Sequence, residues 1–129
     1  MNETCYRFSI YMSSEKVYML GDGEQRRYDF ETLLISERIS YEPSEVISDF
    51  MRMYCNGVKP KAFENRIETP CMLLAKDSDG DFITPSDGML EAYKKGQMQL
   101  YEVCYEMYVE RVIDLNEDEL KAMLNKEVA

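Results

Sequence analysis

The sequence predicts an α+β fold: a single domain over residues 1–129, with a mostly antiparallel sheet and two or three helices packed on one of its faces. Three observations support this prediction. Residues 5–13 alternate apolar and polar side chains like a half-buried strand, residues 43–56 repeat apolar side chains at helical spacing, and residues 98–115 are rich in Tyr and Val, which suit strands. A length of 129 residues is typical of one domain.

The first forty residues are expected to form β structure. The apolar side chains that share one face of the strand CYRFSIYMS are Tyr6, Phe8, Ile10 and Met12. The polar residues 13–15 are expected to turn the chain, and residues 16–20 to form a second short strand. The two glycines of residues 21–23 predict a further turn before a third strand over 25–30. Residues 31–40 fit either a strand or a helix.

One substantial helix is predicted over residues 43–56. Pro43 suits the first helical position, and Glu45 suits the first turn because its charge interacts favourably with the helix dipole. Asn56 and Gly57 supply the left-handed stop. The apolar stripe consists of Val46, Ile47, Phe50 and Tyr54.

The middle of the chain predicts a loop, a hairpin and a short helix. Residues 58–70 are polar and contain proline, so we expect a connecting loop. The apolar run 71–76 and the segment 81–84 are expected to pair across a turn at Asp79 and Gly80. In the next segment, Ser86 can cap a short helix that Gly96 ends.

The segment 98–115 is compatible with both a strand and a helix, and a strand is favoured. As a helix it would stack Glu102, Glu106 and Glu110 at four-residue spacing without an intervening lysine, which is repulsive. As a strand it places these glutamates on one face together with Tyr108. A terminal helix over residues 117–127 is predicted because Asn116 and Glu119 fit a capping box.

The composition argues against several function classes. The formal net charge of −10 disfavours direct binding to a nucleic-acid backbone, and no apolar run is long enough to cross a membrane. The absence of His removes the usual base of nucleophilic catalysis and every imidazole metal site. An enzyme that uses carboxylates or a thiol stays possible, but no residue pattern predicts one. We expect no cofactor.

The four cysteines predict reduced thiols. They lie far apart in the sequence and no secretion signal is evident, so a cytoplasmic location is expected. Cys5, Cys71 and Cys104 lie within apolar, strand-like patterns and are expected to be small core residues.

The stretch KDSDGDFITPSDG raises the question of a calcium loop. Asp77, Asp79 and Asp81 match the first three ligand positions of an EF-hand loop. The glycine expected at position 6 is Phe82, and the glutamate expected at position 12 is Gly88. A hairpin turn explains the same residues, so no metal site is predicted.

Two functional hypotheses follow. The first is a non-catalytic, acidic protein-interaction module, such as an inhibitor of a basic or nucleic-acid-binding partner protein, with Glu102, Glu106, Glu110 and Tyr108 as its binding surface. The alternative reading of the acidic residues is a solvated surface that aids solubility. The second hypothesis is a small-ligand or nucleotide-binding protein that uses Arg26, Arg27 and Tyr28. The sequence predicts neither the partner nor the oligomeric state.

Overall fold

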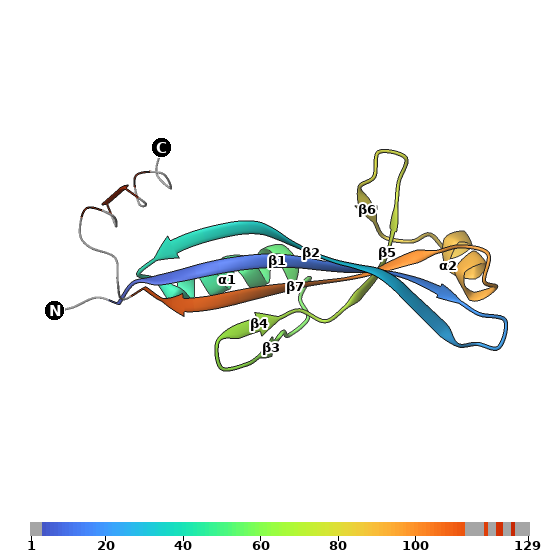
Figure 1. Ribbon diagram of the computed structural model, residues 1–129, viewed down its shortest axis with the longest axis horizontal. Coiled ribbons are helices and arrows are strands. Elements are labelled where there is room, and N and C mark those ends of the chain that lie inside the picture. The colour runs from blue at the N-terminus through green and yellow to red at the C-terminus, as the bar shows by residue number, and fades with distance from the viewer. Residues whose placement is uncertain (1–3, 113–117, 119–120, 123–124, 126–129) are drawn as a thin grey trace. The chain divides into compact units, whose positions relative to one another are not determined.

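The structure, a computed structural model, describes residues 4–112, 118, 121–122 and 125 (Figure 1). In these residues an antiparallel sheet of seven strands is combined with two helices, which confirms the predicted α+β fold. The elements in chain order are β1 (Tyr6–Met19), β2 (Gln25–Ser40), α1 (Pro43–Tyr54), β3 (Lys61–Ala62), β4 (Arg66–Glu68), β5 (Met72–Lys76), β6 (Phe82–Ile83), α2 (Asp87–Lys94) and β7 (Leu100–Arg111).

The strand order is β2-β1-β7-β4-β3, and β5 pairs with both β7 and β6. The chain divides into two compact units. The first contains the described parts of 1–11, 34–70 and 106–129, and the second contains residues 12–33 and 71–105. The prediction of a single domain over residues 1–129 stays a prediction.

In the first unit, α1 begins at Pro43 and buries Val46 and Phe50, as the apolar stripe predicts. The helix ends two residues earlier than predicted, and Asn56 and Gly57 then take the left-handed φ values of 49° and 77°. The buried apolar side chains of this unit are those of Cys5, Phe8, Ile39, Val46, Phe50, Cys55 and Met107.

The predicted loop 58–70 is wrong in part, because it contains a short hairpin of β3 and β4. Lys61 pairs with Glu68, and Phe63 donates its N–H to the carbonyl of Arg66 across the turn. β4 also pairs with β7, with Ile67 opposite Met107. Strands of two and three residues are too short to show an alternation of apolar and polar side chains. The polar composition of residues 58–70 therefore predicted a loop.

In the second unit, the turn between β1 and β2 confirms the prediction for residues 21–23. Leu20 donates its N–H to the carbonyl of Glu24 at 2.7 Å, and Gly23 has a φ of 87°. The predicted hairpin is also present, because Ala75 of β5 pairs with Ile83 of β6. A core of Val17, Ala75, Tyr93 and Leu100 holds this unit together.

Helix α2 begins and ends with the residues that the sequence predicts as its caps. Ser86 accepts a hydrogen bond from the N–H of Met89 at 3.2 Å, and Gly96 follows the helix with a φ of 71°. A Cβ atom at position 96 would lie 2.8 Å from the carbonyl oxygen of Met19, so glycine is required there by both conformation and space.

The turn predicted at residues 13–15 is wrong, because β1 runs without interruption from Tyr6 to Met19. Ser13 is buried, and its hydroxyl lies 3.4 Å from that of Thr32 on β2. A serine whose hydroxyl has a partner on the neighbouring strand can lie within a strand and does not have to form a turn. The ambiguous residues 31–40 are part of the long strand β2. Within 98–115 the predicted strand is confirmed over Leu100–Arg111, which form β7, and residues 113–115 lie outside the described residues.

All four cysteines are free thiols. Cys5 is buried as expected and Cys104 is half-buried, but Cys71 is exposed, so its prediction as a core residue is wrong. The predicted helix 117–127 lies mostly outside the described residues, of which 118, 121, 122 and 125 are helical. No helix in the described part of the chain is long and apolar enough to span a membrane.

Candidate functional site

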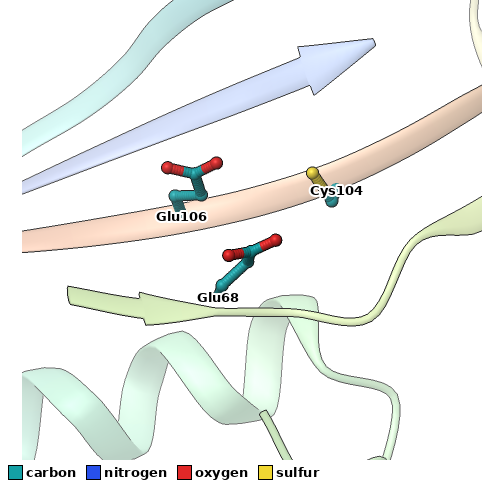
Figure 2. A group of neighbouring side chains, drawn as sticks. All are labelled: Glu68, Cys104 and Glu106. Atoms are coloured by element: carbon teal, nitrogen blue, oxygen red, sulfur yellow. The ribbon is translucent and has the colours of Figure 1, made fainter. Parts of the chain in front are cut away.

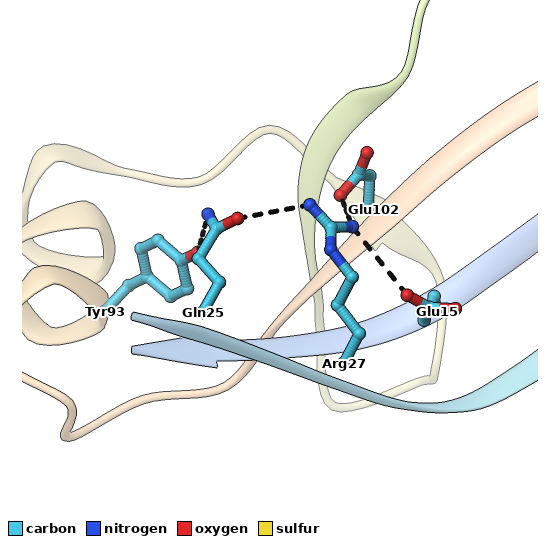
Figure 3. A network of polar contacts seen from close by, with 5 residues as sticks. All are labelled: Glu15, Gln25, Arg27, Tyr93 and Glu102. Atoms are coloured by element: carbon cyan, nitrogen blue, oxygen red, sulfur yellow. Dashed lines mark hydrogen bonds and ion pairs between the residues drawn. The ribbon is translucent and has the colours of Figure 1, made fainter. Parts of the chain in front are cut away.

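Arg27, one of the predicted ligand-binding residues, is held by a polar network in the second unit (Figure 3). Its guanidinium binds the carboxylate of Glu102 on β7, and it lies 3.8 Å from an oxygen of Glu15 on β1. It also donates to Gln25 at 3.1 Å. Gln25 in turn donates to the hydroxyl of the core residue Tyr93 at 2.8 Å. Arg27 is therefore neutralised and fixed by its own chain.

The other two predicted ligand-binding residues do not converge with Arg27. Tyr28 donates its hydroxyl to Gln99 and packs edge-on against Tyr18, with ring centroids 5.7 Å apart. Because side chains alternate along a strand, Tyr28 projects from the opposite face of β2 to Arg27. Arg26 is exposed and makes no ion pair with any described residue. This arrangement gives no anion-binding pocket.

The glutamates of the predicted partner-binding surface have donors within their own units. In the second unit, Glu102 binds Arg27. In the first unit, Glu106 accepts a hydrogen bond of 2.8 Å from the hydroxyl of Tyr108, and Glu110 lies 3.4 Å from Arg7. The hydrogen bond to Glu106 is the largest cause that raises the pKa of Tyr108, and burial of the hydroxyl raises it further. These carboxylates contribute to the structure, and their role as a partner-binding surface stays a prediction.

Glu68 and Glu106 face each other on paired strands of the first unit (Figure 2). Their carboxylate oxygens come within 4.8 Å of each other, which is unfavourable for two like charges. Arg66 compensates in part, since its guanidinium lies 3.6 Å from Glu68. Two carboxylates beside an arginine do not make a cation site.

The three aspartates of the hairpin turn in the second unit also lie together, with carboxylate oxygens within 4.8 Å. One oxygen of Asp77 accepts the N–H groups of Asp79 and Asp81, both at 2.9 Å. Asp77 also donates its own N–H to the carbonyl of Asp81. The turn therefore accounts for the cluster, in agreement with its interpretation as a hairpin turn.

The exposed part of strand β2 is the feature that sequence reasoning missed. In the second unit, the side chains of Phe30 and Leu33 are 64% and 57% exposed. We refer to residues Phe30–Leu33 as the β2 segment. The next two residues on the same strand, Leu34 and Ile35, are also exposed, at 46% and 37%. Large apolar side chains exposed in sequence along one strand are typical of a binding surface.

A groove open to solvent lies beside the β2 segment. Its lining comes from the two strands of the hairpin: Met12, Ser14, Glu31, Thr32 and Leu33. Met12 and Leu33 supply apolar surface, and Glu31 supplies a carboxylate. An open groove of this kind does not enclose a small molecule, but it can receive a side chain from another protein.

The two ends of the strand order differ in how they are protected. β3 is two residues long, contains Lys61 and follows Pro60, all of which discourage pairing with another strand. β2 is 16 residues long, contains neither Lys nor Pro, and among the described strands pairs only with β1. Asp29 interrupts it with a φ of 53°, and the strand continues from Phe30 to Ser40.

The run Leu33-Leu34-Ile35 was a usable signal in the sequence. Three consecutive apolar residues on a strand place apolar side chains on both of its faces. Where only one face of such a strand is covered, at least one of these side chains is exposed.

No protein-family model matches the chain, and no curated protein or solved structure matches it.

Proposed function

We propose that this protein is a non-catalytic protein-interaction module that binds a partner protein through strand β2. The observation that carries the proposal is the exposure of Phe30 and Leu33 on a strand that has one described neighbour. Burial of a side chain of this size against a partner contributes up to roughly 1.5–3 kcal/mol, which offsets part of the entropic cost of association. The unpaired side of the strand can add main-chain hydrogen bonds to an extended partner segment.

The net charge of −10 favours a partner with a basic surface, through faster association and through discrimination against other acidic proteins. A role as an inhibitor of such a partner, and a cytoplasmic location, stay predictions. Binding of a small ligand or nucleotide is less well supported, because Arg27 is already bound by carboxylates and Tyr28 projects from the other face.

The experiment is affinity capture from a lysate of cells that express the protein. The bait is compared with the double variant Phe30→Asp/Leu33→Asp and with the control Met53→Asp. Met53 is 63% exposed on α1, so the control introduces one aspartate at an equally accessible apolar position, where the double variant introduces two. Circular dichroism and the melting temperature establish that each variant is folded.

We expect the wild type and the Met53→Asp control to retain the same proteins, and the double variant to lose them. The proposal fails if the double variant retains what the wild type retains. It also fails if the wild type captures nothing at low salt, where attraction between charged surfaces is strongest.

A further inference from the structure

Glu31 is an acidic residue of the hairpin whose carboxylate has no partner among the residues that the structure describes. Its neighbours on the two strands are neutralised: Asp29 binds the ammonium group of Lys16 at 2.9 Å, and Glu15 lies beside Arg27. Glu31 is exposed, lines the groove, and makes no ion pair with any residue that the structure describes. An unpaired carboxylate is therefore present at the apolar part of the groove.

This combination fits an amphipathic cation. Lys and Arg carry a long apolar stem that can lie on Met12 and Leu33 while the charged head stays in solvent. Glu31 is in position to pair with that head. An acidic or wholly apolar side chain would leave the carboxylate of Glu31 without a partner or would repel it.

We propose that the groove receives a Lys or Arg side chain from a partner segment that adds to the β2 segment as an extra strand. The inference rests on the proposed function and specifies its partner: an extended peptide in which basic and apolar residues alternate. Alternation is required because successive side chains of a strand project from opposite faces, so the basic residue enters the groove while its apolar neighbour can contact Phe30.

A second copy of the chain is the other occupant to consider. The stretch of β2 from Tyr28 to Glu37 contains Asp29, Glu31 and Glu37 and no basic residue. Pairing of two such strands would bring acidic residues together, in a protein that already carries a net charge of −10. A basic segment from another protein has the complementary charge.

The test measures binding of an eight-residue peptide of alternating lysine and valine, blocked at both ends, by isothermal titration calorimetry. The comparison peptides replace every lysine by glutamate, or carry methyl groups on alternate backbone nitrogens. The protein variants are Glu31→Gln and the control Glu91→Gln, which removes an exposed carboxylate from α2.

We expect saturable binding of the lysine–valine peptide to the wild type and to Glu91→Gln. Glu31→Gln should weaken binding about two- to fivefold, as expected for an exposed ion pair, and reduce its dependence on salt. The glutamate peptide and the methylated peptide should not bind, because the first has the wrong charge and the second cannot form the strand hydrogen bonds.

The inference is overturned if Glu31→Gln and Glu91→Gln bind the peptide equally, or if the methylated peptide binds as well as its parent. Analytical ultracentrifugation that shows a dimer dissociated by Leu33→Lys would also overturn it, in favour of a second copy. If the peptide fails while capture still depends on Phe30 and Leu33, this inference falls and the proposed function stands. If the peptide does not bind and capture does not depend on Phe30 and Leu33, both this inference and the proposed function are wrong.

Discussion

Arg27 on β2 and Glu102 on β7 form an ion pair. The two residues are 75 positions apart in the sequence, and each had been predicted to bind a different kind of external molecule. The structure pairs them with each other, so each satisfies the charge of the other. In contrast, Glu31 on β2 makes no ion pair with any residue that the structure describes.

Removal of Arg27 is expected to destabilise the protein modestly. Arg27→Met leaves Glu15 and Glu102 without their shared cation, and exposed pairs of this kind contribute about 0.2–1 kcal/mol each. We therefore expect the free energy of unfolding, from urea denaturation, to fall by about 1 kcal/mol at low salt. A double-mutant cycle with Glu102→Gln should give a coupling that decreases in 1 M salt. A coupling of zero at low salt would show that the pair contributes nothing.

Substitution of Gly96 is expected to be much more harmful than substitution of Gly88. An alanine at position 96 must adopt a φ of 71° and place its Cβ 2.8 Å from the carbonyl oxygen of Met19. The strained backbone alone costs about 1–2 kcal/mol, and the close contact adds to it. Gly88→Ala meets only the Ser86 hydroxyl at 3.9 Å and lies in α2, so it should be neutral or slightly stabilising. Equal melting temperatures for the two variants would contradict this account.

The hydrogen bond from Tyr108 to Glu106 predicts a pH dependence in the alkaline range. Because the pKa of Tyr108 is raised in the folded state, the folded protein keeps this proton where the unfolded chain loses it. The stabilisation is complete below the unfolded pKa of about 10 and is lost as the pH rises through the folded value. The free energy of unfolding of the wild type should therefore fall more steeply above about pH 10 than that of Tyr108→Phe.

Absorbance at 295 nm follows tyrosine ionisation and gives an independent check on this interaction. Glu106→Gln removes the charge that opposes the tyrosinate, so the pKa of Tyr108 should decrease. Glu110→Gln is the control, because Glu110 is on the same strand and contacts Arg7 instead. If the two variants titrate alike, Glu106 is not the cause of the raised pKa.

The parts of the fold that were predictable from sequence are those with a strong local signal. Helix α1 has a proline at its start, an apolar stripe and a glycine stop within one short stretch. Strand β7 was predicted correctly because a helix would have stacked its glutamates. In both elements, local preference and tertiary environment favour the same conformation.

The errors occurred where distant residues decide the outcome. Ser13 belongs to a serine pair that resembles a turn, but its hydroxyl has a partner on β2, 19 residues away. Arg27 and Glu102 could not be matched without the strand order. The exposure of Phe30 and Leu33 depends on the place of β2 at the end of that order, so the apolar run of residues 33–35 indicates exposure only once the strand order is known.

Hydrogen–deuterium exchange tests whether the β2 segment binds a partner strand. Exchange is measured on the protein alone and with the lysine–valine peptide or with a partner recovered by capture. We expect slower exchange of amides in residues 30–33 on binding, and no change in the Glu106–Glu110 stretch of β7. Protection of that stretch with none in the β2 segment would show that the partner binds the glutamate surface predicted from the sequence instead of strand β2.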